Sequence, residues 1–414
     1  MRRLLSHRDA RIYIAGQGLS VIGDSALWLA MGIWVKILTG SNSAAGLTFF
    51  AFICGCLVAP VSGVIVDRVR RRPLLTAVNL GTGAGVCALL LVHGRGQVWL
   101  VYLVMFGYGA ANSLITSAQT ALLPHLVPGD LLGEANSALQ MASQGLRVIT
   151  PLLGAGLLAW VGATPVILVD AGTFVVAAGS VLALRLREPR QVRAERAQGW
   201  RGEFSAGIRY ATRTPALRQP LIACLIAVTT FGFLETVPFA VVAQGLHRTP
   251  GFLGVLTSVQ GTGALAGGFL AGPVMRRTSE KALIAGGLAG CAAAALLLIT
   301  ASLPPVLVAS AALGCCIVWI NVGAVTLIQR RTPGALLGRV DAALEFAITV
   351  PQAASIALGA ALIAAVNYRF LLLAMAAVIA PAAGYLASRR EPPVAATSCG
   401  LQQADSMPRE AGTP

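Results

Sequence analysis

The sequence predicts an all-α membrane protein with twelve transmembrane helices, arranged as two pseudo-symmetric bundles of six helices. Hydrophobic residues make up 56% of the 414 residues and charged residues only 11%, which is too apolar for an ordinary soluble chain. A hydrocarbon core of about 30 Å is crossed by about 20 helical residues. Twelve apolar runs have a suitable length, and they cover 11–38, 44–66, 73–94, 98–122, 134–160, 164–187, 218–245, 250–273, 280–302, 304–328, 339–365 and 367–388.

The arrangement in two bundles is predicted by an internal repeat with a spacing of 205 positions. The segment PGDLLG begins at Pro128, and the related segment PGALLG begins at Pro333. Repeats of this length in an apolar chain are typical of membrane proteins built from two related halves. The same spacing pairs glycines inside the predicted helices, including Gly109 with Gly314 and Gly154 with Gly359.

The repeat and the polar segments divide the chain into four parts. A linker of high polarity joins the halves, and its apolar residues recur at intervals of three and four, which predicts an amphipathic helix on the inner membrane face. These apolar residues are Trp200, Phe204, Ile208 and Ala211. We expect an N-terminal six-helix bundle over 1–187, this cytoplasmic linker over 188–217, a C-terminal six-helix bundle over 218–388 and a disordered cytoplasmic tail over 389–414.

The basic residues predict the orientation in the membrane. The net charge is +15, but the arginines are interspersed with apolar runs and belong to no soluble domain, so nucleic acid is not an expected partner. Of the 31 Lys and Arg residues, 26 fall on the side that holds both termini and four on the other side. The positive-inside rule then predicts a multi-pass protein of the cell membrane, with both termini in the cytoplasm and basic segments that contact membrane lipids.

Several enzyme and metal-binding classes are not supported by the sequence. Neither Lys36 nor Lys281 closes a G-x-x-x-x-G-K segment, so hydrolysis of ATP at a P-loop is not expected. The eight cysteines lie mostly inside apolar runs without the spacing of metal ligands, and no H-E-x-x-H segment is present. We therefore expect no enzyme activity, no metal and no cofactor.

A basic loop joins the second and third predicted helices, and its composition suits a conformational latch. A glycine allows two helices to approach closely, an aspartate accepts hydrogen bonds at a helix N-terminus, and arginines bind carbonyl groups or lipid headgroups. The pattern resembles the loop G-x-x-x-D-R-x-G-R-R/K of the major facilitator superfamily, although Arg70 replaces the inner glycine. The matching residues are Gly63, Asp67, Arg68, Arg71 and Arg72.

The likeness extends over about residues 8–390 and narrows to one branch of this family. The segments QGLSVIGD at 17–24, LTGS at 38–41, LPHLVP at 123–128, EANS at 134–137 and VDA at 169–171 are similar to the drug:H⁺ antiporter branch, which includes macrolide, multidrug and siderophore exporters. In the predicted helix 134–160, Pro151 and Gly154 match an antiporter motif, G-P-x-x-G-G, whose first and last glycines are lost here. The resemblance implies twelve helices in the major facilitator fold and exchange of a substrate for protons.

Two carboxylates within apolar runs are candidate proton carriers. Asp24 falls about 20 Å into the first predicted helix, near the membrane midplane, and it shares a helix face with Gln17 and Ser20. Burial away from water disfavours a charged carboxylate, so Asp24 is suited to bind and release a proton. Glu235 is the second candidate. For each residue the alternative is a fixed structural hydrogen bond, and Asp170 is interpreted as structural because its helix is peripheral in this fold.

Further polar and aromatic residues are expected to line a substrate cavity. Because polar side chains also hold helices together within membranes, contact between helices is the alternative for them. An ion pair between Arg147 and Asp24 is a further hypothesis. The expected cavity residues are Gln17, Ser20, Trp28, Asn112, Thr116, Gln144, Arg147, Glu345, Thr349 and Gln352.

The sequence and the resemblance together predict a secondary exporter that acts as a monomer. It is expected to move hydrophobic or amphipathic small molecules outward in exchange for protons, by alternating access around a midplane site. One alternative is uptake or symport of a metabolite. Another is a lipid-handling protein or receptor that has a transporter-like fold and no ion coupling.

Overall fold

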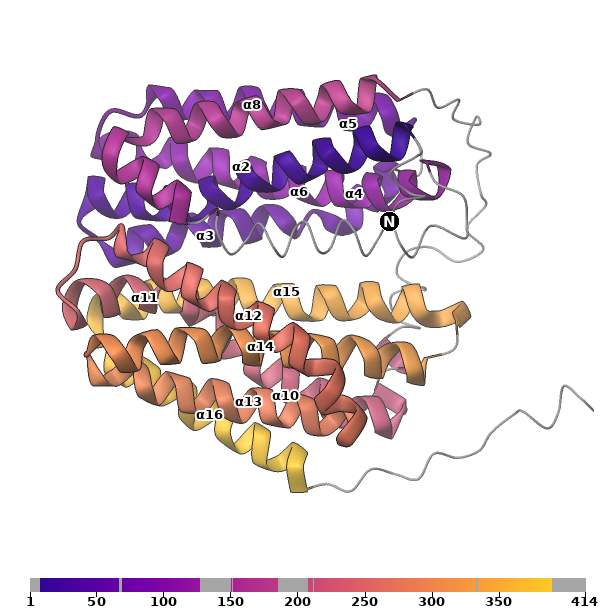
Figure 1. Cartoon of the computed structure of the whole chain (residues 1–414), viewed down its shortest axis with the longest axis vertical. Helices are drawn as coiled ribbons and strands as arrows, with labels where there is room; N and C mark the ends of the chain where they lie inside the picture. The colour runs from indigo at the N-terminus through magenta and orange to yellow at the C-terminus, as the bar shows by residue number, and fades with distance from the viewer. Residues whose placement is uncertain are drawn as a thin grey trace, which may run out of the picture.

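The N-terminal half forms one bundle of helices in the computed structural model, which describes residues 8–66, 69–126, 150, 152–184, 208–210, 212–332 and 334–388 (Figure 1). The starts of α2 and α5 lie at the same end of the molecule (Figure 1). The elements of this half are α2 (Arg8–Thr39), α3 (Asn42–Cys56), α4 (Ala59–Val66), α5 (Arg71–Cys87), η1 (Ala88–Leu91), η2 (Arg95–Gln97), α6 (Val98–Leu126), the helix Leu152–Val161 and α8 (Ala163–Leu182).

The C-terminal half forms a second group of helices, which lies beside the first (Figure 1). Its helices run nearly along the same direction as those of the N-terminal half. The elements are α10 (Pro215–Phe231), η4 (Gly232–Glu235), α11 (Val237–Ala240), η5 (Val241–Gly245), α12 (Phe252–Arg277), α13 (Glu280–Leu297), η6 (Leu298–Thr300), α14 (Leu303–Arg331), α15 (Gly334–Ala365) and α16 (Tyr368–Ser388).

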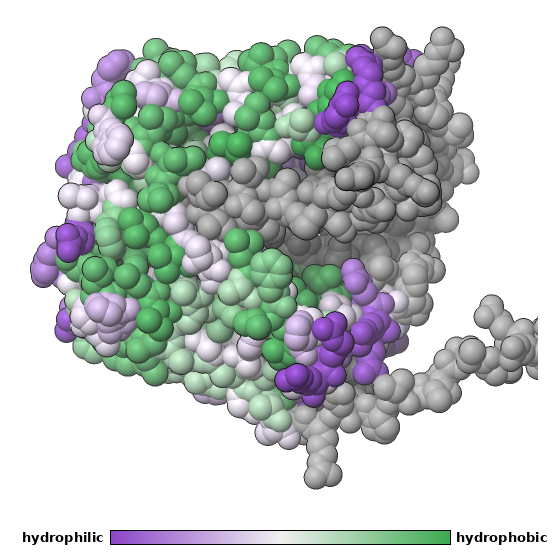
Figure 2. All heavy atoms as spheres, in the orientation of Figure 1, coloured by the Kyte–Doolittle hydropathy of each residue, from purple (hydrophilic) through white to green (hydrophobic). Residues whose placement is uncertain are grey.

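The prediction of an all-helical membrane fold is confirmed. Within the described residues, ten helices are long and apolar enough to cross a membrane, and two shorter apolar helices accompany them, Asn42–Cys56 and Leu152–Val161. Apolar side chains cover the flank of the molecule, whereas the most hydrophilic ones gather toward its ends (Figure 2). Of the predicted helix 134–160, only residue 150 and residues 152–160 are described.

The predicted helix 44–66 is interrupted, and a proline explains the interruption. The helix ends at Cys56, a turn follows at Leu57, and α4 begins at Ala59. Pro60 has no backbone N–H, so it leaves the carbonyl group of Cys56, four residues earlier, without its helical partner. The hydroxyl of Ser113 donates to this carbonyl oxygen at 3.1 Å, which satisfies it from α6.

Equivalent helix crossings in the two halves rely on the glycine pair Gly109 and Gly314. A Cβ atom on Gly109 would lie 2.0 Å from the carbonyl oxygen of Phe52 in α3. A Cβ atom on Gly314 would lie 1.8 Å from the carbonyl oxygen of Gln260 in α12. Backbone-to-backbone contact of this kind excludes any side chain, which explains the two glycines 205 positions apart.

The partner helices follow a slightly different register. A Cβ atom on Gly55 of α3 would lie 2.0 Å from the carbonyl oxygen of Phe106. A Cβ atom on Gly263 of α12 would lie 1.9 Å from the carbonyl oxygen of Ala311. Phe106 and Ala311 are 205 positions apart, whereas Gly55 and Gly263 are 208 apart. The spacing of 205 therefore holds for α6 and α14 but shifts by three residues in α3 and α12.

A second pair of crossings uses Gly154 and Gly359. The Cβ position of Gly154 lies 2.6 Å from the carbonyl oxygen of Ala26, so the helix Leu152–Val161 packs closely on α2. The Cβ position of Gly359 lies 2.8 Å from Oγ1 of Thr236 and 3.1 Å from the ring of Phe233, so α15 packs closely on the η4 segment. Both repeat-related glycines thus allow a close helix approach in their own half.

The two halves contact each other near one end of the molecule, where α2 turns into α3. We name this the hairpin end. The hydroxyl of Ser43 donates to the carbonyl oxygen of Ala360 in α15. A Cβ atom on Gly46 would lie 2.1 Å from Cγ2 of Thr236 and 3.3 Å from Cβ of Ala360. The N-terminal and C-terminal halves are therefore closely packed at the hairpin end.

The segment that precedes α10 is attached to the C-terminal half. The hydroxyl of Tyr210 donates to the carbonyl oxygen of Arg331 at 2.8 Å, at the end of α14. Next to it, Arg330 forms a 2.5 Å ion pair with Glu280, at the start of α13. Of the predicted amphipathic helix, residues 208–210 and 212–213 are helical, and its remaining part lies outside the described residues, as does the tail 389–414.

Candidate functional site

Asp24 lies at the middle of the 32-residue helix α2, within a candidate membrane span. Its carboxylate is half-buried. The phenolic hydroxyl of Tyr108, on α6, donates a hydrogen bond of 2.5 Å to Oδ1 of Asp24. A carboxylate at this depth is costly unless it is hydrogen-bonded or protonated, and the tyrosine supplies a hydrogen bond.

A second carboxylate reaches the same hydroxyl. Oδ1 of Asp170, on α8, lies 3.4 Å from the hydroxyl oxygen of Tyr108. Asp170 is fully buried, at 0% exposure, and Tyr108 is 7% exposed. Asp170 is therefore not remote from Asp24, although its helix was expected to be peripheral. We name Asp24, Tyr108 and Asp170 the carboxylate cluster.

Small and polar neighbours allow the three helices to meet at the carboxylate cluster. The Cβ position of Gly23 lies 2.6 Å from Oδ1 of Asp170 and 2.4 Å from Oγ1 of Thr173, so a larger residue would separate α2 from α8. The hydroxyl of Thr173 donates to the carbonyl oxygen of Asp170 at 2.7 Å. The ring of Tyr108 packs edge-on against Phe174 with centroids 5.6 Å apart, which restricts its orientation.

A series of ring contacts connects the carboxylate cluster with the C-terminal half. Tyr108 contacts Phe52 at a centroid distance of 5.9 Å, and Phe52 contacts Trp28 at 4.6 Å. Trp28 contacts Phe49 at 4.8 Å, and Phe49 contacts Phe239 of α11 at 6.1 Å. We name Phe52, Trp28, Phe49 and Phe239 the aromatic chain. Trp28 is thus placed between aromatic rings, one helical turn after Asp24.

Glu235 lies where the first helix of the C-terminal half loses its regular geometry. It ends the 3₁₀ segment η4 and is half-buried. Pro238, in the first turn of α11, has no N–H to continue the preceding helix. A π-helical segment, η5, follows α11 directly. Irregular backbone within a membrane span is tolerated where it is buried in protein or lines a water-filled cavity, and it frequently marks binding sites in transporters.

Gln17 and Ser20 are buried between helices, at 8% and 7% exposure. The side-chain amide of Gln119, on α6, donates to Oε1 of Gln17. This contact matches the alternative for polar residues, namely that they hold helices together. Asn112 and Thr116 lie four residues apart on an exposed face of α6.

The remaining expected cavity residues are placed only in part. Thr349 and Gln352 are half-buried on α15, and Glu345 lies on the same helix with a side chain outside the described part of the structure. The residues Gln144, Arg147 and Pro151 lie outside the described residues, so the hypothesis of an Arg147–Asp24 pair stays a prediction.

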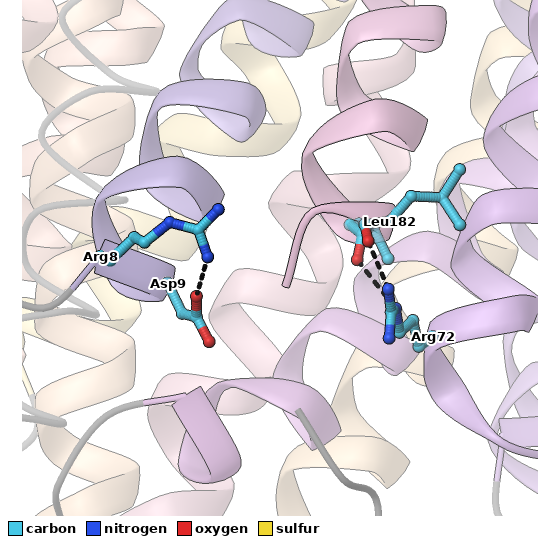
Figure 3. A network of polar contacts seen from close by, with 5 residues as sticks. Arg8, Asp9, Arg72 and Leu182 are labelled. Carbon is cyan, nitrogen blue, oxygen red and sulfur yellow. Dashed lines mark hydrogen bonds and ion pairs between the residues drawn. The ribbon is translucent and has the colours of Figure 1, made fainter. Parts of the chain in front are cut away.

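Arg72, at the end of the basic loop, joins the start of α5 to the end of α8. Its Nε donates to the carbonyl oxygen of Val181 at 3.2 Å, and a terminal nitrogen donates to that of Leu182 (Figure 3). The arginine thus stabilises the C-terminal end of α8, where carbonyl groups lack helical partners. Gly63 lies in α4 and Arg71 begins α5, whereas residues 67 and 68 lie outside the described part.

Sequence reasoning missed the part that Tyr108 and Asp170 play in this site. An ionisable residue inside an apolar run is a functional candidate by default, which was the available signal for Asp170. No pattern in the sequence indicates that Tyr108 reaches both carboxylates, because the three residues are on different helices.

Comparison with known proteins agrees with the fold. A model of the Major Facilitator Superfamily matches residues 13–247 and 221–404. The uncharacterized MFS-type transporter y4rN of Sinorhizobium fredii is 26% identical over 326 residues, which cover 77% of this chain and 78% of that protein. The enterobactin exporter EntS of Citrobacter koseri is 25% identical over 349 residues, which cover 82% of this chain and 81% of the exporter.

A solved structure shows the same fold at low sequence identity. The crystal structure of a bacterial homologue of iron transporter ferroportin in its inward-facing state has a TM-score of 0.71 and 16% identity, and the match covers 92% of this chain and 99% of the homologue. The fold and the site define a multi-pass membrane transporter with small-molecule substrates rather than an enzyme. The chain belongs to the Major Facilitator Superfamily, whose members are secondary transporters.

Proposed function

We propose that the protein exports hydrophobic or amphipathic small molecules in exchange for protons, by alternating access between two related halves. The observation that carries this proposal is the Asp24 carboxylate at the middle of α2, hydrogen-bonded by Tyr108 at 2.5 Å and next to Asp170. Carboxylates at membrane depth are typical of proton pathways. Similarity to an enterobactin exporter supports the outward direction of transport.

In this proposal the acids and the polar faces have separate roles. Asp24 and Glu235 bind the exchanged protons. The substrate contacts the polar faces of α2, α6 and α15 and of the predicted helix 134–160. Its contacts come from the other residues expected from the sequence, namely Trp28, Asn112, Thr116, Gln144, Arg147, Glu345, Thr349 and Gln352, whereas the buried Gln17 and Ser20 hold helices together. Both termini face the cytoplasm, as the distribution of Lys and Arg predicts.

Alternating access requires that the contact at the hairpin end opens and closes. In the structure this contact is formed by Ser43 and Gly46 on one half and by Thr236 and Ala360 on the other. If the termini are in the cytoplasm, the hairpin end faces outward, and in this proposal its contacts close the transporter to the outside. The basic loop at the opposite end then acts as the latch of the other state, in agreement with its likeness to the family motif.

Transport in a host that lacks its major efflux pumps tests the proposal. Cells expressing the protein should accumulate less of a panel of cationic and neutral fluorescent dyes than cells with an empty vector. A protonophore should abolish the difference, and so should Asp24→Asn. Asp9→Asn is a matched control, because Asp9 is an acid near the start of the same helix, paired with Arg8 at 3.7 Å. Export that persists with the protonophore and in Asp24→Asn would contradict proton exchange.

A further inference from the structure

A single hydroxyl proton serves two carboxylates in the carboxylate cluster. The oxygen of Tyr108 lies 2.5 Å from Oδ1 of Asp24 and 3.4 Å from Oδ1 of Asp170. A phenol has one proton to donate, while its oxygen can also accept a hydrogen bond. If both acids were ionised, one of the two contacts would join an acceptor to an acceptor. If one acid is protonated, each contact has a donor.

We propose that Asp24, Tyr108 and Asp170 bind one proton as a unit, and that the proton resides on Asp170 while Tyr108 donates to Asp24. Asp170 then donates from Oδ1 to the tyrosine oxygen, and the negative charge stays on Asp24. The proposal rests on proton-coupled transport and deepens it, since it adds Asp170 and Tyr108 to the proton site.

Burial decides which acid carries the proton. Asp170 is fully buried, and its Oδ2 has no hydrogen-bond partner among the described residues. An unpaired oxygen costs less on a neutral carboxylic acid than on a carboxylate, because the charged group loses more solvation. Asp24 is half-buried and has the shorter bond to the tyrosine, which suits the charged partner. Among the described residues, the titratable groups that act on Asp170 are Asp24 and Tyr108.

Tyr108 also provides a route for the proton. The O–H bond of Tyr108 breaks as an O–H bond forms on Oδ1 of Asp24. The O–H bond of Asp170 breaks as the tyrosine O–H bond re-forms. The net result is transfer of one proton from Asp170 to Asp24, with no change in the tyrosine. The fully buried acid thereby exchanges its proton through the half-buried one.

The fold itself does not require these polar groups. Leu313 is 205 positions after Tyr108, on the helix whose register with α6 is fixed by the crossings of Gly109 and Gly314. Leu313 is apolar and 6% exposed. The same helix position in the other half is thus filled by an ordinary core residue, so the tyrosine and its two acids are a special feature of the N-terminal half.

Infrared difference spectroscopy of the full-length protein in lipid vesicles tests the proposal without any substrate. In a Glu235→Gln background, which removes the other proposed proton carrier, the protein should show the carbonyl band of one protonated carboxylic acid at pH 7, which disappears on alkalinisation. Asp170→Asn should lose this band, because the acid that carries the proton is gone. Asp24→Asn should keep the band at low pH, because Asp170 stays fully buried, but the band should disappear at a lower pH than without the change, because the second charge that helps to hold the proton is removed. Tyr108→Phe keeps both acids, so it should retain the band but lose it more slowly after a jump to high pH.

Asp9→Asn should leave the band unchanged, and size-exclusion chromatography should show that each variant is folded. A band that survives in Asp170→Asn would overturn the proposal, and so would a band in Asp24→Asn that disappears at the same pH as without that change. A band that disappears when Na⁺ is added at constant pH would also overturn it, because it would identify a cation site. If the band behaves as expected but export is insensitive to the protonophore, the shared proton stands and the proposed exchange fails. If export depends on protons but no such band exists, the proposed exchange stands and the shared proton is refuted.

Discussion

Adding one methyl group at the hairpin end should shift the protein toward a state that is open at that end. Gly46→Ala places a Cβ atom 2.1 Å from Cγ2 of Thr236 and 3.2 Å from its Cβ. Ordinary contact between carbon atoms needs about 3.5–4.0 Å, so the two halves must separate by about 1 Å or more. The substitution does not strain either half internally, because Thr236 belongs to the other half.

Rotation of the threonine cannot easily relieve the clash. Thr236 is fully buried, and its hydroxyl donates to the carbonyl oxygen of Phe233 at 3.2 Å. The same hydroxyl lies 2.8 Å from the Cβ position of Gly359, so glycines flank both branches of the side chain. Overpacking of a close contact costs about 1–3 kcal/mol. A cost of this size lowers the population of the closed state, relative to the open state, by about 5- to 150-fold.

Thiol labelling measures this shift. Ser43→Cys introduces a reporter at the contact with Ala360, in a background from which the eight native cysteines have been removed. A maleimide that does not cross membranes is added outside the cells. It should label the reporter faster in the presence of Gly46→Ala than in its absence, by up to about 5- to 150-fold. Gly18→Ala is the matched control, since nothing lies within 4 Å of its Cβ position. Equal labelling rates with and without Gly46→Ala would refute the reasoning, and acceleration by Gly18→Ala would indicate general loosening.

Three further substitutions test the packing and the acids. Gly109→Ala should lower the free energy of unfolding by about 1–3 kcal/mol, because its methyl group would lie 2.0 Å from a backbone oxygen. Gly107→Ala is the control and should not destabilise the protein, since nothing lies within 4 Å of its Cβ position. Thermal unfolding followed with a thiol-reactive dye distinguishes the two variants. Arg72→Ala should cost about 1 kcal/mol in the same assay through loss of its bonds to the end of α8, with Arg72→Lys recovering part of the loss. Glu235→Gln should abolish proton-driven export. It should leave the free energy of unfolding within about 1 kcal/mol of the wild type, because glutamine preserves the shape of the side chain. Unchanged export would remove Glu235 from the proton pathway.

The helices were predictable from the sequence because their cause is local. Apolar length predicts a span wherever the residues are, and the structure has helices at the described parts of the predicted runs. The break between α3 and α4 has a local cause as well, since Pro60 lies inside the predicted run 44–66. The glycine pairs were also visible as a repeat, although the shift of three residues between Gly55 and Gly263 appears only when the contacts are known.

The polar site was less predictable because its cause is the relative placement of three helices. Asp24 was identified from its depth in one helix, which needs no tertiary information. The approach of Asp170 to Tyr108 depends on the rotation of α8 and on the close crossing that Gly23 permits. The pairing of Gln17 with Gln119 depends in the same way on how α2 lies against α6. These contacts cannot be calculated from the period of a single helix.

The aromatic chain connects the carboxylate cluster of the N-terminal half with the C-terminal half. Asp24 lies one helical turn before Trp28, and Glu235 lies a similar distance before Phe239. The ring of Phe49 contacts the rings of Trp28 and Phe239, at centroid distances of 4.8 Å and 6.1 Å. Its Cζ atom is 2.7 Å from the Cβ position of Gly32. The contacts among Phe49, Trp28 and the carboxylate cluster lie within the N-terminal half, so rigid movement of the halves preserves them.

The contact between Phe49 and Phe239 behaves differently, because it joins the two halves. Opening of the hairpin end must separate these two rings while the rest of the aromatic chain stays with the N-terminal half. The ring of Phe49 then loses its aromatic neighbour in the C-terminal half. In the proposed transport cycle, the separation of these two rings belongs to the same movement that separates Gly46 from Thr236. A transporter that exchanges a substrate for a proton needs this link, since the proton site must be exposed to one side of the membrane at a time.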